Sequence, residues 1–263
     1  METAPGPWIA ALRSSQERLR TCVEPLGADG VEPPSYDSEW SIAQVLSHLG
    51  SQAEIFGLFL NPGLSGEDPP GRDAFGPIWD AWNTRSPQSQ VADSLQAGNA
   101  IVERFESLDN EELGRLHLQM FGMDLDATGL ARIVLGEHAV HTWDVAVALD
   151  PAAKVAPDAV DLLVDTLDGP AGRSGKADGE ARRIHVTTSE PERRFVLETG
   201  GAVTLVAGEP ADAESPADAE SHVRLPAEAF LRLVYGRLDP DHTPPVDTQD
   251  VELGTLRSIF PGF

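Results

Sequence analysis

The fold is decided by a long segment over residues 127–149, which reads ATGLARIVLGEHAVHTWDVAVAL. Its apolar residues recur at intervals of three and four, which is the period of an α-helix with one buried face. The residues that this period places on the buried face are Leu130, Ile133, Val134, Glu137, His141, Asp144, Val145 and Ala148. The segment therefore predicts a long helix in which two acids and a histidine interrupt an apolar face.

Three upstream segments have the same helical period. The first covers residues 8–23 and ends near Gly27, and the second begins at Ser41, where Ser41-Ile42-Ala43-Gln44 fits a capping box. We expect the second helix to stop at Asn61-Pro62-Gly63, followed by a Gly/Pro-rich loop to about Gly76. The third long helix begins after Ser86-Pro87, a cap followed by proline at the first helical position. Four helices that are each apolar on one side predict a four-helix bundle.

The pattern changes after Asp150. We expect a helix over 157–167, irregular chain over 169–179, short strands over 183–188, 194–199 and 202–206, and a helix that opens at Leu225-Pro226. Strands followed by a helix indicate a small α+β domain. The sequence thus predicts an α+β protein of two domains, 1–150 and 151–263. An acidic repeat at 211–221 is expected to be a solvated loop and receives no function.

Composition excludes several functional classes. The 263 residues carry 19 basic and 43 acidic side chains, a net charge of −24, which disfavours nucleic acid and anionic membrane surfaces as partners. The single cysteine, Cys22, excludes an internal disulfide and a cysteine-rich metal site. No secretory signal and no apolar run long enough to span a membrane is evident. We therefore expect a cytoplasmic protein.

A metal site is suggested by Glu137 and His141, which lie one helical turn apart. A buried carboxylate must be paired, hydrogen-bonded or bound to metal, and this pair can reach one cation. His48 on the second helix would complete two histidines and one carboxylate, a set that suits catalytic zinc but that nickel, cobalt or iron would accept. The plainer interpretation is an ion pair within the core. Asp144 would either orient His141 or bond a neighbouring helix.

Two signatures resemble those of a known enzyme family. The run Trp40-Ser41-Ile42-Ala43-Gln44-Val45-Leu46-Ser47-His48-Leu49 resembles the helix-two signature of the mycothiol-dependent maleylpyruvate isomerases. The run Glu137-His138-Ala139-Val140-His141-Thr142-Trp143-Asp144 is similar to their second signature, E-x-x-x-H-x-x-D. The resemblance implies a DinB-like four-helix bundle, followed by a small domain that is often compared with sterol-carrier proteins and contributes to the substrate pocket.

The same resemblance implies roles for particular residues. His48, Glu137 and His141 would bind a divalent metal, usually zinc, and mycothiol would be the thiol co-substrate. Arg85, Arg237 and Asp144 would be catalytic, with the arginines holding a substrate carboxylate. Trp82, Asn83 and Arg85 would contact mycothiol. In so acidic a protein, a surface ion pair is the simpler interpretation of either arginine.

The expected function is therefore that of a zinc-dependent enzyme in which the thiolate of mycothiol attacks an electrophilic small molecule. Two reactions fit, transfer of the thiol sulfur and cis–trans isomerisation of the maleylpyruvate type. The alternatives are a metal-dependent hydrolase or amidase acting on thiol conjugates, and a non-catalytic metal-binding member of the fold. The sequence leaves the electrophile open and is compatible with a monomer or a homodimer.

Overall fold

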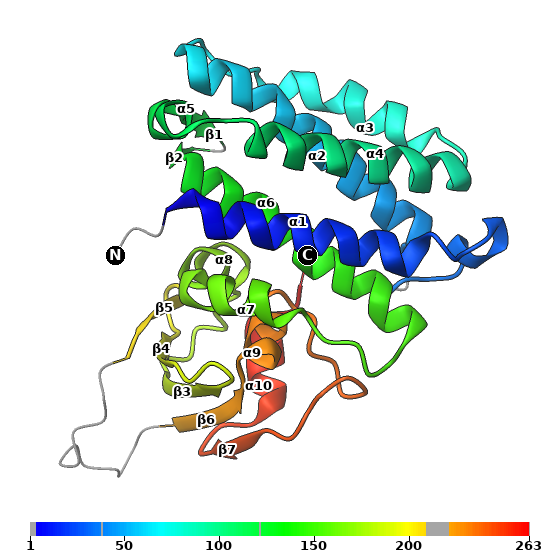
Figure 1. The fold of residues 1–263 in the computed structure, drawn as a ribbon. Coiled ribbons are helices and arrows are strands. Elements are labelled where there is room, and N and C mark those ends of the chain that lie inside the picture. The colour runs from blue at the N-terminus through cyan, green and yellow to red at the C-terminus, as the bar shows by residue number, and fades with distance from the viewer. Residues whose placement is uncertain (1–3, 38, 121, 209–220, 263) are drawn as a thin grey trace. The chain divides into compact units, whose positions relative to one another are not determined.

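The computed structural model describes residues 4–37, 39–120, 122–208 and 221–262, and the chain forms two compact units that divide between Ala159 and Val160 (Figure 1). The division falls within helix α7 (Pro157–Leu163), whereas the sequence pattern changes at Asp150. Among the described residues, no helix combines the length and the apolar character that crossing a membrane requires.

The first unit is mainly helical. Its elements up to α7 are α1 (Pro5–Val23), η1 (Ala28–Val31), α2 (Ile42–Ser65), η2 (Arg72–Ala74), α3 (Phe75–Asn83), α4 (Pro87–Glu106), α5 (Asn110–Arg115), β1 (His117–Met120), β2 (Met123–Asp126) and α6 (Ala127–Leu149). Helix α2 packs along α4, α1 packs along α6, and contacts of α1 with α4 and of α2 with α6 complete the group. The predicted DinB-like four-helix bundle is confirmed.

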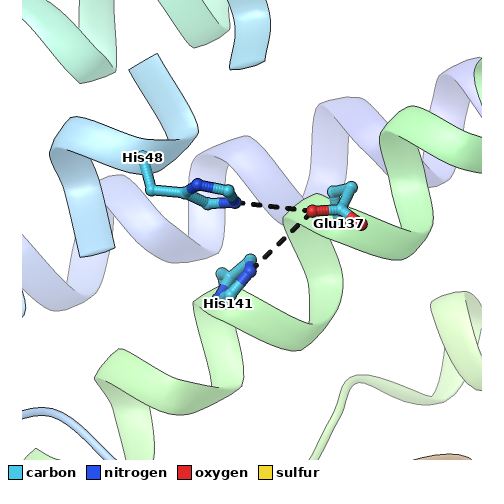
Figure 2. A group of neighbouring side chains, drawn as sticks. All are labelled: His48, Glu137 and His141. Atoms are coloured by element: carbon cyan, nitrogen blue, oxygen red, sulfur yellow. Dashed lines mark hydrogen bonds and ion pairs between the residues drawn. The ribbon is translucent and has the colours of Figure 1, made fainter. Parts of the chain in front are cut away.

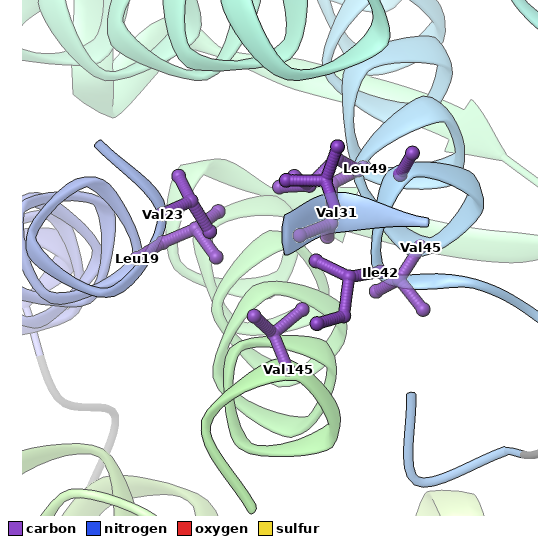
Figure 3. Packing of buried hydrophobic residues seen from close by; sticks show 9 residues of the cluster. Leu19, Val23, Val31, Ile42, Val45, Leu49 and Val145 are labelled. Atoms are coloured by element: carbon purple, nitrogen blue, oxygen red, sulfur yellow. The ribbon is translucent and has the colours of Figure 1, made fainter. Parts of the chain in front are cut away.

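One end of the bundle is closed by a compact apolar cluster. Leu19 and Val23 of α1 meet residues of α2 and Val145 of α6 there, and each of these side chains is buried (Figure 3). The α2 residues and the one from η1 are Ile42, Ala43, Val45, Leu46, Leu49 and Val31. Full burial of one such aliphatic side chain contributes roughly 1.5–3 kcal/mol, so this cluster fixes α2 against α6 near His48.

The helix starts follow the sequence. The Ser41 hydroxyl accepts from the Gln44 amide at 3.2 Å while the Gln44 side chain accepts from the Ser41 amide at 2.8 Å, so the predicted capping box is confirmed. Ser86 caps α4 in the predicted way, and Asp126 caps α6 by accepting from the Gly129 amide. These caps set the helical phase of the residues that follow.

The predicted stop at Asn61-Pro62-Gly63 is wrong, because α2 continues through Pro62 to Ser65. The Pro62 carbonyl still accepts from the Gly66 amide at 2.8 Å, and Gly63 is buried beside Leu118 of β1. The lost proline donor costs one bond in a turn that tertiary contacts hold in place. The helix ends at Gly66, whose φ of 74° is left-handed.

Helix α3 and the β1–β2 hairpin are among the short elements of the first unit that have no counterpart in the sequence prediction. Helix α3 begins at Phe75, within the residues assigned to the Gly/Pro-rich loop. The short antiparallel hairpin of β1 and β2 precedes α6. Both are too short for their period to stand out from the surrounding sequence.

The second unit is an α+β domain, as predicted. It contains η3 (Val164–Thr166), α8 (Asp168–Ser174), β3 (Arg183–Ser189), β4 (Arg194–Glu198), β5 (Thr204–Ala207), β6 (Ser221–Pro226), α9 (Ala227–Val234), β7 (Asp247–Gln249) and α10 (Leu253–Ile259). The strand order is β5-β4-β3-β6-β7, with β3 and β6 parallel and the other pairs antiparallel. The predicted hairpin at Glu198-Thr199-Gly200-Gly201 joins β4 to β5, with Glu198 opposite Thr204.

Two predictions for this unit need correction. Residues 169–174 belong to α8 instead of irregular chain, because Ser174 donates to the carbonyls of Pro170 and Val234 and so ties this glycine-containing turn to α9. Leu225-Pro226 ends the strand β6, and α9 begins only at Ala227. The acidic repeat lies outside the described residues except for Ser221, the first residue of β6.

Helix α6 is buried around most of its circumference. On the predicted stripe Ile133 is half-buried and Ala148 is exposed, whereas residues on the other side are buried, among them Ala131, Leu135 and His138. The single buried stripe was therefore a wrong prediction. The reason is that α6 packs against α1 on one side and α2 on the other, so both faces are covered.

Candidate metal centre

The structure brings together the three side chains that the sequence predicts as metal ligands (Figure 2). His48 comes from α2, and Glu137 and His141 come from consecutive turns of α6. Nε2 of His48 lies 3.5 Å from Oε2 of Glu137, and Nε2 of His141 lies 3.8 Å from the same oxygen. One ligand atom from each residue falls within 4.8 Å of the others. Two helices distant in sequence thus point three donor atoms at one place.

These separations match the requirements of a small divalent cation. Zinc bonds of 2.0–2.1 Å to nitrogen and oxygen at tetrahedral angles place neighbouring ligand atoms about 3.3 Å apart. The two distances to the Glu137 oxygen exceed this value by a few tenths of an ångström, and all three ligand atoms lie within 4.8 Å of one another, so the side chains would move closer together around a bound ion. Two imidazoles and one carboxylate also form a donor set used in catalytic zinc sites. The cluster can therefore hold such an ion.

Asp144 fixes the orientation of His141. Its Oδ2 lies 2.8 Å from Nδ1 of His141, one turn along α6, and the Asp144 side chain is almost wholly buried. A hydrogen bond from Nδ1–H to this carboxylate leaves the Nε2 lone pair facing Glu137 and His48. Of the two interpretations of Asp144 that the sequence leaves open, the geometry favours the one in which it orients His141.

The cluster is accessible from solvent on one side. The Glu137 side chain is 36% exposed, and both histidines are partly exposed. The ring of Trp40, just before α2, lies 5.4 Å from the ring of His48, centroid to centroid. Sequence analysis did not identify Trp40 as a site residue, although Trp40 is the first residue of the helix-two signature and directly precedes the helix cap Ser41.

His138 lies next to Glu137 in sequence but faces α1. Its Nδ1 lies 2.8 Å from the hydroxyl of Ser15, and its Nε2 lies 2.8 Å from Oε1 of Gln16. Because the Gln16 amide nitrogen donates to the Leu95 carbonyl, its oxygen is the atom that faces His138. Burial lowers the pKa of His138 to about 4, which keeps the ring neutral at physiological pH. This histidine is a core residue.

Trp82, Asn83 and Arg85 lie at the end of α3 and just beyond it, beside α2. Trp82 is buried and its Nε1 donates to Glu54, while the Asn83 side chain accepts a long bond of 3.5 Å from Ser47. The Arg85 guanidinium lies 3.6 Å from the centroid of the Trp82 ring and 3.2 Å from Asp93. Arg85 already has a carboxylate partner. Contact of the three residues with mycothiol stays a prediction.

Close packing of α3 on α2 depends on Gly50, which sequence analysis passed over. A Cβ atom at position 50 would lie 2.1 Å from the Trp82 ring, so only glycine lets that ring approach the helix backbone. A glycine in the middle of a long apolar helix is the sequence signal for such an approach. Gly50 thereby sets the position of the segment that carries Asn83 and Arg85.

The other predicted residues lie elsewhere. Arg237 belongs to the second unit, where its Nη1 donates to the carbonyl of Tyr235, and its catalytic role stays a prediction. Cys22 lines a separate cavity of about 480 Å³ between α1 and α6, and burial raises the pKa of its thiol. Cys22 is not part of the three-ligand cluster.

Comparison with solved structures finds proteins that are similar to this chain in fold. The crystal structure of the mycothiol-dependent maleylpyruvate isomerase matches this chain with a TM-score of 0.69 and 12% identity, covering 95% of each chain. A histidine-to-alanine mutant of that enzyme matches with the same values. YfiT from Bacillus subtilis, described as a probable metal-dependent hydrolase with an unusual four-helix bundle topology, has a TM-score of 0.40 and 16% identity, covering 55% of this chain and 87% of that chain.

Comparison with curated proteins found no match. A family model, by contrast, aligns with residues 12–146, which make up just over half of the chain and include α2, most of α6 and all three clustered side chains. The description of that model is the mycothiol maleylpyruvate isomerase N-terminal domain. This chain therefore belongs to the mycothiol maleylpyruvate isomerase N-terminal domain family.

Proposed function

We propose that this protein is a zinc-dependent enzyme that uses mycothiol as a nucleophile against an electrophilic small molecule. The observation that carries the proposal is the cluster of His48, Glu137 and His141, with Asp144 behind His141. Three protein ligands leave a fourth tetrahedral position for a co-substrate, which is the arrangement of catalytic rather than structural zinc. The exposed edge of Glu137 gives that position access to solvent.

A thiol supplied from outside fits the chain. Its only cysteine, Cys22, lies apart from the cluster, and burial raises the pKa of that thiol, which keeps it protonated. A sulfur nucleophile at the cluster must therefore belong to a second molecule, and the family name supports mycothiol. When bound, zinc would lower the pKa of a coordinated thiol so that the sulfur reacts as thiolate.

Each protein side chain then has a defined task. His48 and His141 would each offer Nε2 to the ion, and the Asp144 carboxylate would accept a hydrogen bond from Nδ1–H of His141. Glu137 brings the negative charge that a dication requires. For isomerisation, the sulfur would add to a cis double bond, the resulting single bond would rotate, and the sulfur would leave from the trans product. For S-transfer, the carbon–sulfur bond would persist in the product.

A carboxylate-bearing electrophile would be held by cations. We assign this role to Arg85, and Arg237 is the alternative that the family resemblance offers. Arg85 is partly exposed and stacked on Trp82, so its guanidinium is held in place while one edge remains available. Nη1 of Arg85 already pairs with Asp93. A substrate carboxylate would therefore have to bind the guanidinium together with Asp93 or displace it.

Cobalt substitution tests the proposal. Cobalt(II) replaces zinc and reports a bound sulfur by ligand-to-metal charge transfer, so adding mycothiol to the cobalt protein should produce a new near-ultraviolet band. The Cys22→Ser variant should give the same band, because the sulfur is external. A cobalt protein that binds no thiol, yet hydrolyses amides of thiol conjugates without added thiol, would establish the hydrolase instead.

A further inference from the structure

We propose that Trp40 is the residue that recognises the sugar part of the thiol co-substrate, as one wall of the site beside His48. The inference rests on the proposed function and adds a specificity determinant to it. The indole ring lies 5.4 Å from the imidazole of His48, and that imidazole lies 4.7 Å from the ring of His141. Trp40 thus forms the outer end of a row of three rings, two of which belong to the candidate metal ligands.

Trp40 is one of two exposed tryptophans, and it is the one that contacts a candidate metal ligand. It is 37% exposed and Trp79 on α3 is 44% exposed, whereas Trp8, Trp82 and Trp143 are each 4% exposed or less. Exposed apolar area costs roughly 25 cal/mol per Å² relative to burial, so a large aromatic ring left open beside a polar cluster is a feature of binding surfaces. The exposed face is available to a ligand.

The backbone amide and carbonyl of Trp40 are both hydrogen-bonded within the chain. The Trp40 amide donates to the Asp37 carbonyl at 2.8 Å, and the Trp40 carbonyl accepts from both the amide and the hydroxyl of Ser35, at 2.8 and 2.9 Å. The next residue, Ser41, is the N-cap of α2. These hydrogen bonds hold the Trp40 backbone next to the N-cap of α2, which lowers the ordering cost for a ligand that stacks on the ring.

The surroundings favour an uncharged, hydroxyl-rich partner. Two acids, Asp37 and Glu39, lie within the three residues before Trp40 in sequence, and the whole chain carries a net charge of −24. This charge disfavours an anionic partner, and carboxylates can accept hydrogen bonds from hydroxyls. The face of an indole ring suits the C–H face of a sugar, and its Nε1–H is a donor. A pseudodisaccharide attached to a thiol has this chemistry.

The test compares two thiols that differ in the sugar. In the cobalt-substituted protein, mycothiol and N-acetylcysteine are each titrated while the charge-transfer band is followed. Trp40→Ala should weaken mycothiol binding about tenfold, the loss expected for one aromatic contact, and leave N-acetylcysteine binding within about twofold. Trp79→Ala is the matched control, because Trp79 is 44% exposed but lies on α3; both affinities should stay unchanged.

The cobalt content of the Trp40 variants distinguishes two roles for Trp40, recognition of the thiol's sugar and structural support of His48. Trp40→Ala should retain one cobalt per chain, and Trp40→Phe should recover most of the mycothiol affinity. Loss of cobalt in Trp40→Ala, or an equal loss of both thiols, would overturn the inference in favour of a structural role for Trp40. If neither thiol produced the band in the parent protein, the proposed function would fall, and this inference with it.

Discussion

His138 and His141 lie three residues apart on α6, and their surroundings differ in almost every respect. His138 faces α1, is fully buried, and has a hydroxyl and an amide oxygen against its two ring nitrogens. His141 faces α2, is partly exposed, and has a carboxylate at each nitrogen, Asp144 at Nδ1 and Glu137 near Nε2. One turn of helix thus carries a histidine of the core and a histidine of the candidate metal centre.

The difference shows what separates a structural histidine from a ligand. Neutral partners that satisfy both nitrogens leave no lone pair for a cation and favour the uncharged ring. A carboxylate behind one nitrogen, with a second histidine and an acid in front of the other, leaves one lone pair directed at a shared point. Burial alone would rank His138 as the more important residue, whereas the chemistry of the partners selects His141.

The largest effect is the loss of zinc affinity expected when one of the candidate ligand histidines is removed. His141→Ala and His48→Ala should lose zinc affinity by more than about a hundredfold, since even the residues behind metal ligands contribute 10–100-fold. His138→Gln should retain one zinc per chain, measured by elemental analysis after dialysis. One bound zinc per chain in either His141→Ala or His48→Ala would show that these three residues are not the zinc ligands.

A second difference between the histidines is pH dependence of folding. His138 has a pKa of about 4 when folded and 6.5 when unfolded, so the unfolded state binds more protons between these values. Its contribution is complete above pH 6.5 and is lost as the pH falls toward 4, by about 3 kcal/mol in all.

Urea unfolding of the metal-free protein at several pH values measures this loss without contributions from metal release. The His138→Gln variant should lack this part of the slope between pH 6.5 and 4. Identical pH profiles for the parent and the variant would mean that His138 is not the buried, neutral group described here.

The third prediction concerns Asp144, the carboxylate that faces His141 but has no counterpart at His138. Asp144→Asn keeps the shape of the side chain but removes the charge that faces Nδ1 of His141, so zinc affinity should fall roughly 10–100-fold. Competition with a chromogenic chelator measures the change. Asp93→Asn, which removes the partner of Arg85 on α4, is the matched carboxylate control and should leave zinc affinity unchanged. Equal affinity in Asp144→Asn and the parent protein would show that orientation of His141 does not matter.

Local signals account for much of what could be predicted. The helical period and the caps at Ser41 and Ser86 locate the long helices, since both depend on neighbours within a few residues. The spacing of Glu137 and His141 likewise follows from one turn of helix. By contrast, the continuation of α2 past Pro62 depends on packing against β1, more than fifty residues later in the chain, and could not be predicted locally.

The partners of each histidine also come from distant parts of the sequence and could not be predicted locally. Ser15 and Gln16 reach His138 from more than a hundred residues away, so the saturation of that ring is a property of the packed bundle. The pairing of His48 with Glu137 spans 89 residues. Its prediction depended on the assumption that the second helix packs against the fourth and on the family resemblance, because spacing places only Glu137 and His141 together. The sequence predicts which side chains one helix turn carries, and the packing of α1 and α2 decides which of them remain available to a ligand.

The smallest expected effect separates the two hydroxyls that approach Nδ1 of His138. Ser15 lies at 2.8 Å and Thr142 at 3.2 Å, but a neutral Nδ1 has a single lone pair, so the shorter bond should carry most of the stabilisation. Ser15→Ala should lower the free energy of unfolding by about 1–3 kcal/mol, and Thr142→Val, which keeps the side-chain volume, by about 1 kcal/mol or less. Denaturant unfolding of the metal-free variants ranks the two, and zinc affinity should be unchanged in both because neither residue touches the metal face of α6. A larger loss for Thr142→Val would mean that the ring accepts its hydrogen bond from within its own helix, and that α1 contributes to this face by apolar packing alone.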